Sequence, residues 1–265
     1  MSGLVELSAV YANFMLGPQR GPGVCSDCFD LIGASGGCSR CAHFGGWVDA
    51  AAPISYSVAG GQLHHALANY KRLTGPPARF LMVGVAAVLW RHLALHEQCL
   101  ARAAGVGSFN VVTTVPSSDR ARQESHPLQR LVGELVAPVR ARYERLLRRT
   151  GAAATPHQFT IHKYEAIREL SGRSVLLIDD TWTTGANAQA AAAALKHGGA
   201  GTVAAVVVGR YVNRDHAKND QQLRGLPAFD WAACAWCREP QRTIRRGEDR
   251  SRAGGDQAGG AHDGR

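Results

Sequence analysis

Hydrophobic positions in the second half of the chain form two short runs on either side of a helical pattern. Residues 175–178 are all apolar, and this run ends abruptly in two carboxylates, Asp179 and Asp180. After a polar turn, residues 188–195 are almost all alanine, the strongest helix former, until a glycine pair ends the pattern. Residues 202–208 form the second apolar run. This order predicts a strand–loop–helix–strand unit, and ligands of open α/β sheets bind at such loops.

The remaining pattern predicts further elements along the chain. In order, we expect a helix over residues 4–15, a strand over 53–58, a helix over 63–73, a long helix from Pro76 to about residue 103, a strand over 109–115, a helix from Pro127 to near Pro138 and a short strand over 159–162. Residues 140–149 are rich in arginine and are interpreted as a solvated face, with a nucleic-acid patch as the alternative. The longest apolar stretch, residues 80–90, is too short to span a bilayer, and residues 1–10 predict no secretory signal.

The loop before the alanine helix contains groups that suit two parts of one ligand. Backbone N–H groups at the start of a helix, together with the helix dipole, suit a phosphate, and Asn187 stands where an N-cap is expected. The hydroxyls of Thr183 and Thr184 add donors, and Gly185 allows the backbone to approach closely. The preceding carboxylate pair suits hydroxyl groups or a hydrated divalent cation. Together these preferences describe a ribose 5-phosphate, whereas the alternative interpretation is a solvated turn.

Two C-x-x-C pairs near the N-terminus predict a metal site. Cys25 and Cys28 are followed, after nine intervening residues, by Cys38 and Cys41. Pairs at this separation can place four thiolates tetrahedrally around one zinc ion. The chain has seven cysteines and no visible secretory signal, which indicates metal binding in a reducing cytosol rather than a disulfide framework. A thioredoxin-like redox role is the weaker alternative, because one pair would suffice for it and no strand precedes these pairs.

The other three cysteines lead to different expectations. Cys99 lies in the predicted long helix and is interpreted as a buried core thiol. Cys234 and Cys237 form a further C-x-x-C without an obvious partner pair, so both a metal role and two ordinary thiols remain open. From Arg238 onward the chain has almost no apolar residues, and we expect this tail to be disordered.

Composition and charge limit the classes of ligand. A chain of 265 residues with 45% hydrophobic content can bury one substantial core and an accessory module. The net charge of +9 indicates a polyanionic ligand, and both a phosphorylated substrate and nucleic acid fit that description. A second candidate anion site is the Ser- and Arg-rich loop over residues 116–122, which follows a predicted strand.

The loop sequence LLIDDTWTTGANA resembles the phosphoribosyl-pyrophosphate (PRPP) loop of type I phosphoribosyltransferases. A P-loop nucleotide-binding protein is disfavoured, because the chain contains no G-x-x-x-x-G-K-[ST] motif. The four-cysteine module, a segment with Tyr70 and Lys71, a loop at Val115 and Pro116 followed by arginines, and the PRPP loop occur in the order typical of the ComF family. ComF proteins are phosphoribosyltransferase-like proteins related to competence for DNA uptake.

The resemblance implies an α/β fold of the Rossmann-like, type I phosphoribosyltransferase kind, with a mainly parallel sheet, helices on both faces and a small N-terminal zinc module. It also implies Mg²⁺-dependent transfer of ribose 5-phosphate from PRPP to an acceptor, with release of pyrophosphate. The alternative is a non-enzymatic accessory protein of DNA uptake that binds DNA or a helicase partner. The expected domains are an N-terminal helix and linker over residues 1–24, a zinc module over 25–47, a phosphoribosyltransferase-like domain over 48–213 and a C-terminal extension over 214–265.

The same resemblance assigns roles to individual residues. Asp179 and Asp180 would hold the ribose hydroxyls, directly or through metal-bound water, and would be the catalytic carboxylates. The PRPP-binding residues are this pair and the loop that follows it, comprising Thr181, Thr183, Thr184, Gly185, Ala186 and Asn187. Candidates for pyrophosphate binding are Lys71, Arg120 and Arg122.

The chain departs from the family pattern at a few positions. Thr181 and Asn187 replace the usual aliphatic residue and the common Ser or Thr. Residues 122–126 read Arg-Gln-Glu-Ser-His where ComF members usually carry Arg-Gly-Phe-Asn. Thr183 occupies the position at which hypoxanthine-guanine-type enzymes carry an Asp that acts near the purine, which disfavours purine salvage and leaves the acceptor open.

Overall fold

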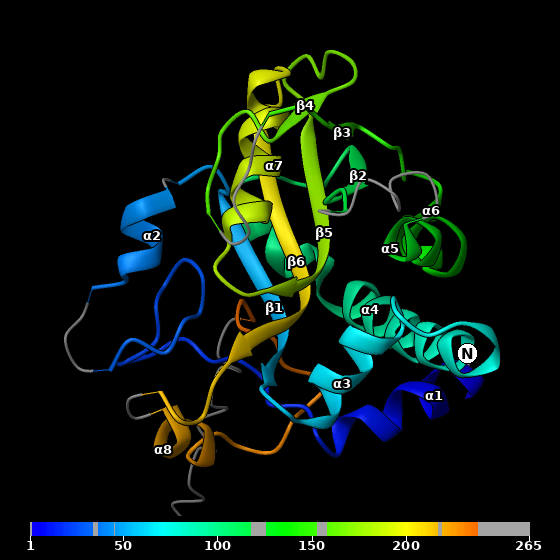
Figure 1. The fold of residues 1–265 in the computed structure, drawn as a ribbon, viewed down its shortest axis with the longest axis vertical. Coiled ribbons are helices and arrows are strands. Elements are labelled where there is room, and N and C mark those ends of the chain that lie inside the picture. Colours follow the sequence, from blue (N-terminus) through cyan, green and yellow to red (C-terminus); the bar gives the residue numbers. More distant parts are fainter. Residues whose placement is uncertain are drawn as a thin grey trace, which may run out of the picture.

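The computed structural model describes residues 2–33, 37–44, 46–117, 126–152, 158–216 and 219–237 (Figure 1). The elements are α1 (Ser2–Ala12), α2 (Ser39–Phe44), β1 (Ala50–Val58), α3 (Gln62–Asn69), α4 (Gly75–Ala103), β2 (Val111–Thr114), α5 (Pro127–Arg130), the π-helical turn η3 (Leu131–Leu135), α6 (Ala137–Arg140), β3 (Leu147–Arg149), β4 (Tyr164–Ala166), β5 (Ser174–Trp182), α7 (Ala186–His197), β6 (Thr202–Val212) and α8 (Asn219–Arg224).

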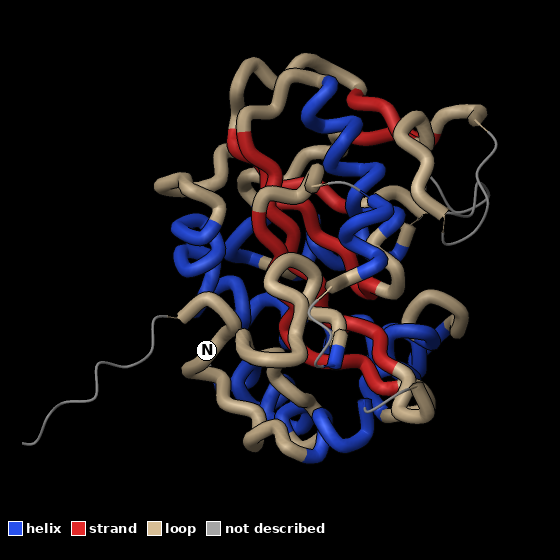
Figure 2. Tube along the Cα trace, turned by 90° about the vertical axis from the view of Figure 1, so that its left-hand side faces the viewer, coloured by secondary structure: helices blue, strands red, loops and turns tan. Residues whose placement is uncertain are grey.

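Four parallel strands in the order β1-β6-β5-β2 form the central sheet, and β3 and β4 form a separate antiparallel pair. Helices pack against both faces of the central sheet (Figure 2). The predicted mixed α/β architecture with a mainly parallel sheet is therefore confirmed. The predicted strand–loop–helix–strand unit is β5, α7 and β6, and both of its strands extend beyond the apolar runs that predicted them.

Successive side chains of a strand point to opposite faces of the sheet, so those of β5 join two hydrophobic clusters. Leu176 and Ile178 pack in the cluster that includes α3 and α4, whereas Val175 and Leu177 pack in the cluster that includes α7. Figure 1 shows α7 in front of the sheet and α4 running behind it. Because each face is covered by a helix, the strands are apolar on both sides, as expected for a buried parallel sheet.

Strand β2 is shorter than its neighbour β5, and this difference leaves a space beside Asp179 and Asp180 at the end of β5. Thr114, the last residue of β2, pairs with Ile178, so the ladder ends one residue before Asp179. On the other side of β5, the pairing with β6 continues, with Asp179 opposite Val207. The carboxyl end of β5 is therefore held by one neighbour and is open beside the other.

Helix α4 is the long helix predicted to start at the proline pair. Its partner α1 packs on it closely, since a Cβ on Gly84 would lie 2.2 Å from the Tyr11 hydroxyl. Although residues 80–90 alone predicted no membrane span, the whole of α4 has the length and composition to cross a membrane. One such helix is weak support for a membrane span, because the core helix of a globular protein passes the same test, and α4 contributes buried residues to the core.

Some local predictions were wrong. The short strand expected over residues 159–162 lies instead at Tyr164–Ala166. In the arginine-rich segment over 140–149, Arg140, Arg145 and Arg148 are exposed, as expected of a solvated face, although the segment also contains β3 and the buried Leu146. The helix expected from Pro127 is interrupted by η3, which separates α5 from α6. These segments are short, and their tertiary neighbours decide their conformation more than their own pattern does.

The C-terminal extension is structured in its first part. Helix α8 contributes Leu223 to a small cluster with Tyr56 and Val212. The tail from Arg238, for which disorder is predicted, lies outside the described residues.

Candidate functional site

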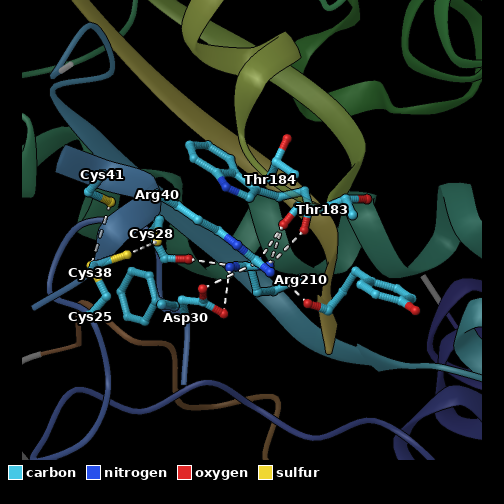
Figure 3. Close-up of polar contacts among 12 residues, drawn as sticks. Cys25, Cys28, Asp30, Cys38, Arg40, Cys41, Thr183, Thr184 and Arg210 are labelled. Atoms are coloured by element: carbon cyan, nitrogen blue, oxygen red, sulfur yellow. Dashed lines mark hydrogen bonds and ion pairs between the residues drawn. The ribbon is translucent and has the colours of Figure 1, made fainter. Parts of the chain in front are cut away.

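The four N-terminal thiols converge as the spacing predicts (Figure 3). The Sγ atoms of Cys25 and Cys41 are 3.6 Å apart, those of Cys28 and Cys38 are 3.7 Å apart, and all four lie within 4.8 Å of one another. A tetrahedral zinc ion with Zn–S bonds of about 2.3 Å requires S···S separations of about 3.8 Å. A hydrogen bond from Cys41 and the charge of Arg210 lower the pKa of the Cys28 thiol to about 5. This cluster can hold a metal ion such as zinc.

The loop between β5 and α7 has the geometry of an anion site. Gly185 has a φ of 88°, and a Cβ at this position would lie 2.6 Å from the Trp182 indole nitrogen, so only glycine fits without strain. Gly185 is the N-cap residue of α7 and has no side chain to cap it, and the Ala186 N–H that opens the helix donates a 3.3 Å hydrogen bond to the Thr184 hydroxyl oxygen. A cavity of about 60 Å³ is lined by the end of β5, the loop and the first turn of α7, between Asp179 and Ala188.

The two carboxylates occupy different environments. Asp180 is buried; it accepts a hydrogen bond of 2.5 Å from the Tyr70 hydroxyl and forms an ion pair with Lys71. Asp179 is partly exposed and accepts a hydrogen bond of 2.9 Å from the backbone N–H of Asp180. Burial and the neighbouring Asp180 carboxylate raise the pKa of Asp179 to about 7. Asp179 is therefore the carboxylate available to a ligand, whereas Asp180 is already partnered.

A larger cavity of about 570 Å³ joins these groups at the open side of β5. The predicted site residues that line it are Lys71, Asp179, Asp180, Thr181, Thr183 and Asn187. Thr184, Gly185 and Ala186 line the smaller loop cavity, and the Ala186 side chain is buried. The loop at Val115 and Pro116 forms the opposite wall of the larger cavity. Arg120 and Arg122 lie outside the described residues.

Asn187 is not the N-cap of α7, contrary to the sequence prediction. The N-cap is Gly185, two residues earlier, and the Asn187 Oδ1 atom accepts a hydrogen bond of 2.5 Å from the Lys163 ammonium. Lys163 is buried, which lowers its pKa. Sequence reasoning missed this lysine, because it precedes the three-residue strand β4 and no motif marks it.

A buried arginine connects the cysteine module to the loop between β5 and α7 (Figure 3). Arg210, on β6, is fully buried and donates hydrogen bonds of 2.9 Å to the carbonyl oxygens of both Cys28 and Thr183. Its guanidinium also pairs with Asp30 at 2.8 Å. Arg40 pairs with the same aspartate and donates a 3.0 Å hydrogen bond to the Thr183 carbonyl. The only sequence signal for this network was a charged residue two positions after the apolar run over 202–208.

The structure also brings together a second set of potential metal ligands, His96, Cys99, Cys234 and Cys237. Their donor atoms lie within 4.8 Å of one another, so this cluster too can hold a metal ion. Cys99 is partly exposed and lies beside Cys237, so its interpretation as a buried core thiol was wrong.

Comparison of this chain with models of known protein families, with curated proteins and with solved structures found no match.

Proposed function

We propose that this chain is a phosphoribosyltransferase that binds PRPP and Mg²⁺ in the cavity beside β5 and transfers ribose 5-phosphate to an acceptor, with release of pyrophosphate. The observation that carries the proposal is the placement of Asp179, Lys71 and the start of α7 around two cavities whose linings share Asp179, Thr181, Thr183 and Asn187. A carboxylate, an ammonium group and a helix N-terminus match the hydroxyl, pyrophosphate and phosphate groups of PRPP. The resemblance of the loop sequence to a PRPP loop supports the same ligand.

The loop residues would bind the 5′-phosphate. A phosphate in the small cavity would meet the N–H groups at the start of α7 and the Thr183 and Thr184 hydroxyls. The hydrogen bond between Lys163 and Asn187 holds the first turn of α7 from outside this cavity. Arg40 and Arg210 hold the Thr183 carbonyl, so the loop is preorganised rather than free.

The two carboxylates would act differently. Asp179 would bind the ribose hydroxyls and is the residue placed to contact water of the Mg²⁺ ion, which typically keeps waters and substrate oxygens as ligands. Asp180 holds Lys71 at the cavity wall, and the Tyr70 hydroxyl fixes Asp180 in turn. Lys71 would then stabilise the pyrophosphate as it leaves and as the ribose gains positive charge, which is electrostatic catalysis.

Calorimetric titration with PRPP, with and without Mg²⁺, tests the binding site. Thr183→Asp places a carboxylate in the phosphate loop, and we expect PRPP affinity to fall at least about tenfold through charge repulsion, a loss of about 1.4 kcal/mol. Thr183→Asn is the matched control, because it has nearly the same shape without the charge. Absence of PRPP binding by the folded wild type, or equal affinity of the two variants, contradicts the proposed site.

Catalysis requires a separate measurement. Pyrophosphate release from PRPP should depend on an added acceptor, and screening nitrogen-containing bases and related amines identifies it. Asp179→Asn should reduce this release, whereas Asp215→Asn, an exposed carboxylate, should not. PRPP binding without any acceptor-dependent release would support a PRPP-sensing role instead.

The alternative of a DNA-uptake accessory protein has less support from the described residues. In the arginine-rich segment, Arg142 pairs with Glu97 and Arg148 pairs with Glu165, so these cations are partly neutralised. DNA binding through several phosphates would weaken steeply as salt rises. A DNA titration over a salt series therefore distinguishes this alternative from PRPP binding.

A further inference from the structure

The second cluster of potential ligands combines two segments that are far apart in the sequence. His96 and Cys99 are three residues apart on α4 and therefore lie on one face of the helix, and Cys234 and Cys237 belong to the C-terminal segment after α8. The Cys237 Sγ atom is 3.5 Å from His96 Nδ1, 3.5 Å from Cys234 Sγ and 3.9 Å from Cys99 Sγ. A tetrahedral zinc ion with ordinary Zn–S and Zn–N bonds requires separations of about 3.8 Å between sulfurs and about 3.6 Å between sulfur and nitrogen. The observed spacings match that geometry.

The histidine is held in the form that binds metal. Its Nε2 atom lies 2.8 Å from the carbonyl oxygen of Trp231, and a carbonyl oxygen only accepts hydrogen bonds. The proton of a neutral His96 is therefore on Nε2, and the lone pair of Nδ1 faces Cys237. Such a hydrogen bond from the distal ring nitrogen to a carbonyl typically orients metal-binding histidines.

The backbone around the C-terminal pair is arranged to support thiolates. The N–H of Cys234 points to Cys237 Sγ at 3.2 Å, and the N–H of Trp236 points to Cys234 Sγ at 3.4 Å. On the helix side, the Arg102 guanidinium donates to Cys99 Sγ at 3.4 Å. Donors directed at sulfur stabilise the negative charge that thiolate ligands carry.

We propose that His96, Cys99, Cys234 and Cys237 bind one structural zinc ion, in addition to the ion that the N-terminal cysteines can hold. Four protein ligands leave no open coordination position, which is typical of structural rather than catalytic zinc. The ion fastens the C-terminal segment to α4.

This attachment explains how a segment with little regular structure is held on the domain. Trp236 donates from its indole nitrogen to the carbonyl of Ala51 at 2.7 Å, on the edge strand β1, and its ring meets Phe29 of the cysteine module at 6.0 Å. Trp231 packs under the Arg91 guanidinium at 4.4 Å. Cys234 lies between these two tryptophans in the chain and Cys237 directly follows the second, so an ion bound there would fix both tryptophans against the core.

Metal content of the full-length protein tests the proposal. Native mass spectrometry of wild type should show two zinc ions per chain. Cys234→Ser/Cys237→Ser and Cys25→Ser/Cys28→Ser should each retain one, and the two double variants serve as controls for each other. One zinc in wild type, retained in full by the Cys234→Ser/Cys237→Ser protein, would overturn the second site.

A single substitution tests the ligand set without removing the site. His96→Cys should keep two metal ions, and its Co²⁺-substituted form should gain thiolate charge-transfer absorbance, whereas His96→Gln should lose one ion. His65→Gln, an exposed histidine on α3, should leave both metal content and spectrum unchanged. An unchanged spectrum in His96→Cys overturns the proposal even if the double variants fail to fold.

Thiol titration of the denatured, unreduced protein tests whether two of these cysteines form a disulfide instead of binding metal. All seven cysteines should be free thiols after the metal is removed. Recovery of only five, with Cys99, Cys234 or Cys237 in the missing pair, would indicate a disulfide in place of the metal site and would overturn the proposal.

Discussion

The buried guanidinium of Arg210 donates a 2.9 Å hydrogen bond to the carbonyl oxygen of Thr183, at the start of the loop that precedes α7. The same side chain contacts Cys28 and Asp30 in the cysteine module. One residue of β6 therefore joins the first candidate metal site to the candidate phosphate site. This relationship gives the N-terminal module a role in positioning the loop, beyond its own stability.

Arg210→Met is expected to destabilise the protein by about 3–5 kcal/mol, because it leaves Asp30 with only the more exposed Arg40 as a partner and removes the donor to four backbone carbonyls. Arg214→Met is the control, since Arg214 forms an exposed pair with Asp220 that contributes at most about 1 kcal/mol. Urea unfolding of both variants measures the difference. Equal stability of the two variants would show that the buried network contributes little.

The pH dependence of stability reports the environment of Asp179. Its folded pKa is raised to about 7, so the folded protein binds this proton more tightly than the unfolded chain does. The stability contributed by Asp179 is therefore fully present below pH of about 4 and is lost as pH rises through 7. We expect Asp179→Asn to become more stable relative to wild type across this window. Asp215→Asn, which is exposed, should follow wild type in urea unfolding at each pH.

Gly185→Ala should reduce both stability and PRPP affinity. The left-handed φ of 88° costs a non-glycine residue on the order of 1–3 kcal/mol, and the added Cβ would press on the Trp182 indole. Gly107→Ala is the control, because a Cβ there meets nothing within 4 Å. Thermal unfolding and PRPP calorimetry check the pair, and a neutral Gly185→Ala result would mean that the loop is not fixed in this conformation.

Two truncations separate the C-terminal segment from the tail. Removing everything after Cys237 should leave thermal stability and PRPP affinity unchanged, because the removed residues include a single large aliphatic, Ile244, and cannot offset their ordering entropy. Removing everything after Asp230 also deletes Trp231, Trp236 and the C-x-x-C pair, and should lower the melting temperature and cost one zinc ion. A drop in melting temperature in the shorter truncation would show that the tail packs on the domain.

Several local features follow directly from sequence patterns. The apolar run before Asp179 predicted β5, the alanine-rich run predicted α7, and the two C-x-x-C pairs predicted four converging thiols. Each of these signals is contained in a short stretch, because strand periodicity, helix propensity and knuckle spacing act between near neighbours. Residues 159–162 carried a weaker signal, and the strand formed a few positions later.

The sequence by itself determined which residue types stand at the end of each strand, and with them the acidic pair, the glycine turn and the first cysteine cluster. Only the tertiary structure decided which of the two carboxylates is available to a ligand, because Tyr70 and Lys71 reach Asp180 from the end of α3 and the turn after it. The same is true of the second cluster, in which Cys99 and Cys237 are separated by 138 positions. Local pattern reports which face of an element is apolar, but it carries no information on which distant segment packs there.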